Sequence, residues 1–299
     1  MTLERSAELV SDGYTLLESP RWHNGSLWVS DFFSRRVLRF DVTGDLPLSA
    51  ATVCVVPGQP SGLGFMPDGQ LRISSMITRE VLAWNGVTLN VLAGLSAFIT
   101  GPANDLAIDS TGIMIIGNFG LNPDHPSEAL PTSLLRVDPD GAVTVAADDL
   151  LFPNGIVIDE GAGKLYVSET YRSRITMFDY DRGALSNRQV WVAFSPDPYQ
   201  YDIPRVTPRL AMLPDGLCQD AEGALWVADA KGHGASRIAD DGTVLEFVNT
   251  GDLSVYAVAL GGADRAELFL CCAPPVESFN PTNSTRSALM RCRVDVPGV

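Results

Sequence analysis

The sequence predicts an all-β fold: a six-bladed β-propeller with four antiparallel strands per blade, built as a single domain from residues 1–299. Three observations predict it: a segment pattern that recurs six times, glycine turns between short apolar runs, and no amphipathic helical pattern longer than about ten residues. A β-sandwich is the structural alternative, because evenly spaced short strands also occur in that fold.

The recurring pattern is a polar or small residue, a short apolar strand, a tight turn with glycine, a second strand, a gap, and a strand that ends near an aspartate. The residues that head the six copies are Glu18, Ser61, Asn104, Asn154, Asp215 and a position at Val255–Tyr256. We call them the heading residues. Counted to Val255, their spacings are 43, 43, 50, 61 and 40 residues, near the length of one four-stranded blade.

The blades follow one another along the chain. The turns expected between their first two strands are Asn24-Gly25, Asp68-Gly69, Thr111-Gly112 and Glu222-Gly223, and later turns are expected at Asn85-Gly86, Asp140-Gly141 and Asp241-Gly242. Glycine permits the positive φ that such turns need. The runs between turns alternate as strands do, as in Leu-Trp-Val, Leu-Tyr-Val and Ile-Thr-Met-Phe. The N-terminal residues 5–10 are candidates for a strand of the last blade.

Composition restricts the partners. The chain has 21 basic and 36 acidic residues and a formal charge of -15, which disfavours nucleic acids and anionic membranes. A cation or a neutral small molecule is easier to bind. Five cysteines without a C-x-x-C pair, an N-terminus without an apolar leader and the lack of a long apolar run lead us to expect a soluble, cytoplasmic protein.

The heading residues predict a metal site. In a propeller the innermost strands begin at one face, so we expect the six headings to converge there. Glu18, Asn104, Asn154 and Asp215 offer carboxylate or amide oxygens, and a cation would remove the cost of crowding two carboxylates. Oxygen ligands favour one divalent ion such as Ca²⁺, Mg²⁺ or Mn²⁺, with zinc and iron left open. A cation that only fills the channel and a site open to water and substrate both fit this pattern.

Five segments carry a family resemblance: LLESPRW, NDLAID, FPNGIVID, LPDGLCQDAEGALWVAD and YAVALGGADRAELFL. Together they resemble the SMP-30/gluconolactonase/LRE-like family of six-bladed propellers, which are metal-dependent lactonases. The resemblance implies that Glu18, Asn154 and Asp215 are metal ligands and that Asp215 is also the catalytic base. It further implies that Asn104 contacts the substrate or a water bound to the metal.

The chain also departs from the family. Members that act on sugar lactones commonly have an arginine two residues before the asparagine of the "ND" segment, where this chain has Pro102. Proline has no side-chain donor for a polar substrate. Phe32 and Phe33 are candidates for an apolar pocket wall, so the substrate is expected to be a sugar-type or a less polar lactone.

Two long connections, residues 117–133 and 194–213, are expected to open on the site face, because loops of this length in a compact domain are usually functional or disordered. We expect the second to act as a lid. Asn118, Phe119 and Tyr201 are the candidate substrate contacts in these connections.

The sequence therefore predicts a metal-dependent lactonase whose partner is a small molecule. One alternative is a related propeller enzyme that hydrolyses phosphotriesters or performs cyclisation or dehydration. Another is a non-catalytic binding propeller stabilised by Ca²⁺. The oligomeric state is left undecided.

Overall fold

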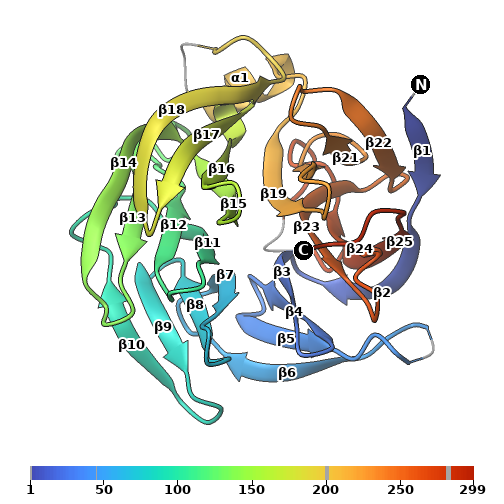
Figure 1. The fold of residues 1–299 in the computed structure, drawn as a ribbon, viewed down its shortest axis with the longest axis horizontal. Coiled ribbons are helices and arrows are strands. Elements are labelled where there is room, and N and C mark those ends of the chain that lie inside the picture. Colours follow the sequence, from blue (N-terminus) through green and yellow to red (C-terminus); the bar gives the residue numbers. More distant parts are fainter. Residues whose placement is uncertain (1, 45, 199–201, 281–283) are drawn as a thin grey trace. The chain divides into compact units, whose positions relative to one another are not determined.

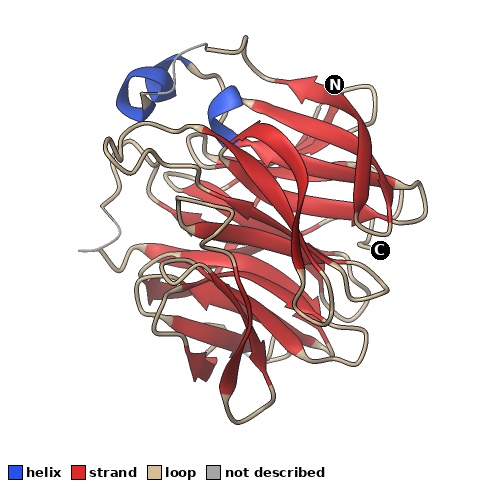
Figure 2. Cartoon of the chain, turned by 90° about the vertical axis from the view of Figure 1, so that its left-hand side faces the viewer, coloured by secondary structure: helices blue, strands red, loops and turns tan. Residues whose placement is uncertain are grey.

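The computed structural model describes residues 2–44, 46–198, 202–280 and 284–299, and nearly all of its regular structure is β-strand (Figure 1). The helices in this part of the chain are short (Figure 2): α1 (Ile203–Val206) and two 3₁₀ turns, η1 (Thr170–Arg172) and η2 (Thr207–Arg209). The strands form six sheets, each with four antiparallel strands, and one sheet has a fifth strand in addition. The predicted six-bladed β-propeller is confirmed.

The chain divides into two compact units, Met1–Gln59 with Asp215–Val299, and Pro60–Pro214. Each unit is built around three of the blades. That residues 1–299 form a single domain stays a prediction.

The first unit contains the first, fifth and sixth blades. The first blade has β3 (Leu17–His23), β4 (Ser26–Asp31), β5 (Arg36–Phe40) and β6 (Ala50–Val55). The fifth has β19 (Pro214–Gln219), β20 (Leu225–Asp229), β21 (Gly234–Ile238) and β22 (Val244–Asn249). The sixth has β23 (Ser254–Gly261), β24 (Glu267–Ala273), β25 (Ser287–Arg293) and β2 (Glu8–Tyr14).

The N-terminal segment contributes to two blades. Strand β2 pairs antiparallel with β25, so the last blade does take an N-terminal strand, and Figure 1 shows the blue β2 beside the red β24 and β25. Strand β1 (Leu3–Ser6) instead pairs in parallel with β22 and gives that blade a fifth strand. The Arg5 guanidinium fixes it there through contacts of 2.6 Å with Glu246 and with Asp295.

The second unit contains the second, third and fourth blades. The second blade has β7 (Pro60–Phe65), β8 (Leu71–Ser75), β9 (Glu80–Trp84) and β10 (Leu89–Gly94). The third has β11 (Ala103–Ile108), β12 (Met114–Asn118), β13 (Pro131–Val137) and β14 (Val143–Leu151). The fourth has β15 (Pro153–Asp159), β16 (Lys164–Glu169), β17 (Arg174–Asp181) and β18 (Ala184–Ala193).

The predicted turns form because their glycines adopt positive φ. All seven glycines have φ between 73° and 93°: Gly25, Gly69, Gly86, Gly112, Gly141, Gly223 and Gly242. Side chains with a Cβ are rarely found in this region of φ. The turn residues therefore fix the strand register that the apolar pattern requires.

The hydrophobic core lies between neighbouring blades of a unit. One cluster joins the first and sixth blades around Phe40 and Phe269, and another joins the second and third around Leu106 and Met114. Strand β12 is buried along its whole length, because its blade lies between the second and fourth blades of the same unit, and β8 is buried along its whole length as well.

Neighbouring inner strands approach so closely that one of them needs glycine. A Cβ built on Gly62 in β7 would lie 2.4 Å from the backbone nitrogen of Leu106 and 2.8 Å from the carbonyl carbon of Asp105 in β11. These are backbone atoms, which cannot turn aside. Glycine at this position is therefore a condition for the packing of the second blade on the third.

We predict that Gly62→Ala lowers the free energy of unfolding by about 2 kcal/mol or more, because the added methyl group forces the two strands apart. Gly94→Ala is the matched control, since a Cβ there meets nothing within 4 Å. Chemical denaturation of both variants measures the difference. Equal stability of the two variants would contradict the assigned packing.

Candidate active site

Five inner strands carry a β-bulge at or next to their heading residues, and in the first of them Glu18 pairs with Ser30 just before the bulge. The register shifts between Glu18 and Arg21 in β3, and at equivalent places in β7, β11, β15 and β23. The residues inside these bulges include Ser61, Asn104, Asn154 and Tyr256. Bulges re-aim side chains and are frequent beside active sites. The repeat thus marks, in blade after blade, the place where the strand departs from regular pairing.

The sixth heading residue is Tyr256. Val255, the position from which the spacing was counted, is fully buried in the core between the fifth and sixth blades. The register shift in β23 falls between Val255 and Ala257, so Tyr256 occupies the bulge, and its hydroxyl donates to the Pro274 carbonyl at 2.8 Å.

The first unit supplies two carboxylates. Glu18 is half-buried and accepts a hydrogen bond from the Ser19 backbone at 3.1 Å, where Ser19 has the unusual φ of 51°. Asp215 is 5% exposed, near the start of β19. The next residue, Gly216, lets β19 lie against β23, because a Cβ there would be 2.6 Å from Cα of Ala257.

The negative charge of Glu18 affects the Cys271 thiol in the core of the first unit. Burial raises the pKa of the Cys271 thiol well above its usual value, and the nearby Glu18 carboxylate raises it further. Cys271 is therefore a neutral core thiol rather than a nucleophile or a metal ligand.

The second unit supplies two amides in a chain of hydrogen bonds. Asn104 accepts from the Ser61 hydroxyl at 3.2 Å and donates through Nδ2 to the Pro153 carbonyl at 3.3 Å. Asn154 donates through Nδ2 to Thr170 Oγ1 at 3.3 Å. Both asparagines are buried, at 4% and 7% exposure, so their conformations are fixed by these bonds and by packing.

The residues after β12 have different surroundings. Asn118 is fully buried, and its amide donates to the Ser133 carbonyl and accepts from Gly120 and Thr132, which closes the base of the 117–133 connection. Phe119 is half-buried beside it. A substrate contact for either residue stays a prediction, and Tyr201 lies outside the described residues.

Phe119 is part of an aromatic cluster that the sequence analysis did not identify. Its ring stacks on Phe152 with centroids 4.5 Å apart, and Phe152 meets Tyr171 edge-on at 4.9 Å. Phe152 precedes the Pro153–Asn154 pair and Tyr171 follows Thr170. We call Phe119, Phe152 and Tyr171 the aromatic cluster. Phe32, in contrast, is only 5% exposed, and its place in a pocket wall stays a prediction.

The two long connections are hydrogen-bonded to each other. Within 117–133, Leu121 pairs with Ala129, and Glu128 in turn pairs with Asp202 of the second connection. The Ile203 amide donates to the Ser127 carbonyl at 2.8 Å. The described parts of the two connections therefore share one backbone network. Closure of the second as a lid stays a prediction.

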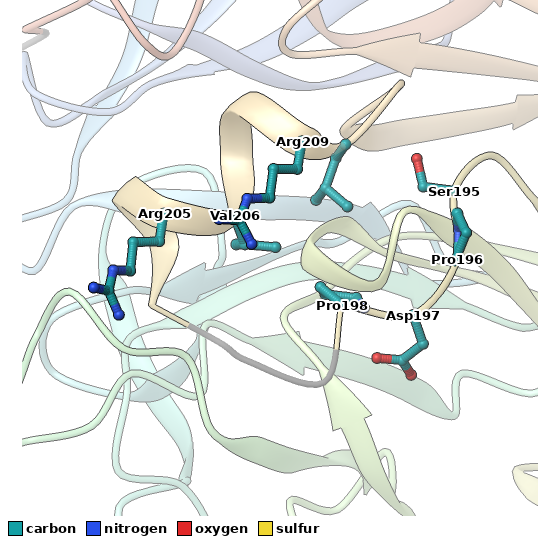
Figure 3. Close-up of a pocket in the computed structure, with 8 residues that line it drawn as sticks. Ser195, Pro196, Asp197, Pro198, Arg205, Val206 and Arg209 are labelled. Atoms are coloured by element: carbon teal, nitrogen blue, oxygen red, sulfur yellow. The ribbon is translucent and has the colours of Figure 1, made fainter.

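A pocket lies within the second connection itself. Figure 3 shows Ser195–Pro198 on one side and the helical turns with Arg205, Val206 and Arg209 on the other. No heading residue lines it.

A buried ionic cluster supports the fourth blade. Glu169, at the end of β16, has no exposed surface and contacts Arg174 at 2.6 Å and Arg172 at 2.9 Å, while the Leu151 amide donates to it at 2.8 Å. Burial by itself would raise the pKa of Glu169, but the Thr176 hydroxyl, the two guanidiniums and the Leu151 amide outweigh burial and lower it. The carboxylate is therefore charged, and it anchors the turn that carries Thr170.

The donor atoms at the headings are oxygens. In the part of the chain that the structure describes, no three His, Cys, Asp or Glu side chains come together as a metal site would need. Carboxylate and amide oxygens are both accepted ligands of hard divalent ions.

Comparison with known proteins identifies the family. The model of the SMP-30/Gluconolactonase/LRE-like region matches residues 16–273. The chain belongs to this family. The resemblance noted in the sequence segments is confirmed, and the matched range contains the headings from Glu18 to Tyr256.

Relatives within reach of sequence comparison carry two kinds of name. The chain is 28% identical to pentonolactonase XacC of Haloferax volcanii over 315 residues, covering 100% of this chain and 96% of that protein. It is 25% identical to regucalcin of Danio rerio over 265 residues, covering 86% and 82%. Among solved structures, the calcium-binding protein regucalcin of Agrobacterium tumefaciens has a TM-score of 0.78 at 19% identity, covering 100% and 97%, which shows a shared fold.

No helix among the described residues is long and apolar enough to cross a membrane.

We predict that Glu169→Gln lowers the free energy of unfolding at pH 7 by about 3 kcal/mol, because Arg174 and the buried Arg172 lose the fully buried carboxylate that they share. Since the folded-state pKa of Glu169 lies below the unfolded one, its contribution is present above about pH 4.5 and is lost as pH falls through the folded value. Denaturation from pH 7 to pH 3 should therefore show a flatter acid limb in this variant. Glu4→Gln, at an exposed position, is the control. Parallel acid limbs for wild type and Glu169→Gln would refute the assignment.

Proposed function

We propose that this chain is a metal-dependent lactone hydrolase that opens a lactone to its hydroxy acid. The observation that carries the proposal is the family match over residues 16–273, which includes Glu18, Asn104, Asn154 and Asp215. The name of one relative, pentonolactonase, supports a lactone as the substrate class and a small molecule as the partner.

The proposed function uses one hard divalent cation. We infer that Glu18 and Asp215 provide carboxylate oxygens and Asn154 an amide oxygen as its ligands, which suits Ca²⁺, Mg²⁺ or Mn²⁺ and leaves zinc and iron as further candidates. The name "calcium-binding protein" of the Agrobacterium regucalcin supports a divalent ion. When bound, the cation supplies Lewis-acid polarisation of the lactone carbonyl.

Asp215 acts as the general base. It accepts a proton from the attacking water while the water oxygen bonds to the carbonyl carbon. The bond between that carbon and the ring oxygen then breaks, and the protonated Asp215 returns its proton to the departing alkoxide. The new carboxylic acid ionises, so each turnover releases one proton. Asp215 is 5% exposed, and low exposure strengthens its interaction with charge that develops beside it.

Asn104 is proposed to contact the substrate. Its amide is already engaged by the Ser61 hydroxyl and the Pro153 carbonyl, so it meets the substrate in one fixed orientation. Such pre-organisation reduces the ordering cost of binding.

The substrate side of the site favours a less hydroxylated lactone. Pro102 stands where sugar-lactone members have arginine, and the half-buried rings of Phe119 and Phe152 add apolar surface in the same unit. Aromatic side chains offer a large apolar contact area and few hydrogen-bonding groups.

A second candidate is a binding propeller stabilised by Ca²⁺. It is favoured by the relatives named regucalcin. In that case removing the ion lowers thermal stability, and no lactone is turned over. A cytoplasmic location agrees with either function, since all five cysteines are free thiols.

We predict that Asp215→Asn lowers kcat/KM for lactones at least about 100-fold, because the general base is lost. A chelator should abolish wild-type activity, and adding back a divalent cation should restore it. Proton release from a lactone panel, with a phosphotriester included, measures both effects.

Asp68→Asn is the matched control for this experiment. Asp68 lies in an exposed Asp-Gly turn that accepts asparagine equally well, so activity should be unchanged. Lactone hydrolysis that persists both after chelation and in Asp215→Asn would end the metal-hydrolase proposal.

We predict that Phe119→Ala raises KM for aryl or alkyl lactones several-fold more than KM for aldonolactones, because it removes aromatic surface and no hydrogen bond. Phe98→Ala is the control, since Phe98 is 40% exposed and is no member of the aromatic cluster. Steady-state kinetics on both substrate types decides the point. An equal change for both types would leave the aromatic cluster without a role in selection.

A further inference from the structure

An asparagine ligand poses an orientation problem that a carboxylate does not. The two ends of its amide are an oxygen, which binds a hard cation, and an NH₂ group, which repels one. Rotating the amide by half a turn therefore converts a ligand into an obstacle. A site that uses Asn154 needs a group that decides which end faces the ion.

The hydrogen bonds of Thr170 determine the orientation of the Asn154 amide. The Thr170 hydroxyl donates to the Pro214 carbonyl at 2.9 Å, and a carbonyl can only accept. A hydroxyl has a single proton, so Thr170 Oγ1 can present only a lone pair to Asn154, 3.3 Å away. The NH₂ end of Asn154 satisfies that lone pair, and the oxygen end is left pointing elsewhere.

Asn104 provides a comparison within the same unit. Its Oδ1 accepts from the Ser61 hydroxyl and its Nδ2 donates to the Pro153 carbonyl, so both ends of the amide are engaged. For Asn154 the described residues give a partner to the nitrogen end. This difference distinguishes an amide suited to ligate a cation from one suited to hold its neighbours.

Thr170 is itself held firmly. It is 4% exposed and opens η1, where the Ser173 amide donates to the Thr170 carbonyl at 3.2 Å. The residue before it is Glu169, the centre of the buried ionic cluster, and the Thr170 amide donates to the Phe152 carbonyl at 3.4 Å. Hydrogen bonds of the Thr170 amide and carbonyl therefore hold the backbone that carries the hydroxyl.

We propose that Thr170 is a positioning residue that holds Asn154 Oδ1 toward the divalent cation. This inference rests on the proposed metal-dependent function. Groups that orient a ligand typically affect metal affinity 10- to 100-fold when they are removed.

The test compares Thr170→Val, which keeps the shape and removes the hydroxyl, with Thr170→Ser, which keeps the hydroxyl. Chelator-treated protein is titrated with Ca²⁺ and with Mn²⁺ by calorimetry, and melting is followed without metal. We expect Thr170→Val to weaken cation binding about 10-fold or more, and Thr170→Ser to stay within about threefold of wild type. At saturating cation, Thr170→Val should recover most of its kcat.

A second background isolates orientation from stability. In Asn154→Asp both ends of the side chain are oxygens, so orientation ceases to matter. Adding Thr170→Val to Asn154→Asp should then change the cation Kd by less than about threefold, which is the non-additivity expected of coupled residues. Thr170→Ala is the substitute if Thr170→Val does not fold, and the same values are expected.

The outcomes separate the two proposals. A Thr170→Val protein that binds cations as wild type does, or an equal loss of affinity in both backgrounds, overturns the positioning role and leaves the metal-dependent function intact. A wild-type protein that binds no divalent cation overturns both. A lowered metal-free melting temperature with unchanged Kd assigns Thr170 a purely structural role.

Discussion

The close approach of neighbouring inner strands is the constraint on which the rest of this structure depends. Where Gly62 faces the backbone of Asp105 and Leu106, and where Gly216 faces Ala257, even a methyl group would overlap main-chain atoms. Strands this close cannot place ordinary side chains between them. In β7, β11 and β15 the regular pairing breaks near the start of the strand, and the bulge contains a polar side chain: Ser61, Asn104 or Asn154. The positions of these polar side chains thus follow from the packing of the inner strands.

The same constraint explains how polar atoms are satisfied in the second unit. Buried amides and hydroxyls must find partners, and here they find them in main-chain carbonyls of the same unit: Asn104 in that of Pro153 and Thr170 in that of Pro214. The prolines at these positions have no N–H to donate within the sheet, but their carbonyls can still accept hydrogen bonds. The heading residue Asn104 is thus hydrogen-bonded to the start of the neighbouring inner strand, which requires the two strands to lie close together.

Sequence predicted the parts that local chemistry determines. Glycine turns fixed all seven of the expected positive-φ positions, and the repeat located Ser61, Asn104 and Asn154 at their bulges. The repeat left the sixth heading between Val255 and Tyr256, and the register shift between Val255 and Ala257 selects Tyr256. The parallel pairing of β1 was not predictable, since it depends on Arg5 reaching Glu246 and Asp295, which are more than 240 positions away.

Contacts between residues that are far apart in the sequence could not be predicted from it, for a related reason. Thr170 reaches Asn154 only because β16 pairs with β15 and ends beside its start. The aromatic cluster combines positions 119, 152 and 171, which share no local sequence pattern. These residues lie at strand ends or in connections, whereas the headings lie within strands. Because the described parts of the two long connections share the Ile203–Ser127 bond and the Glu128–Asp202 bridge, a change in one alters the support of the other. Under the proposed function, these two connections would be altered together, while strand packing holds the heading residues in place.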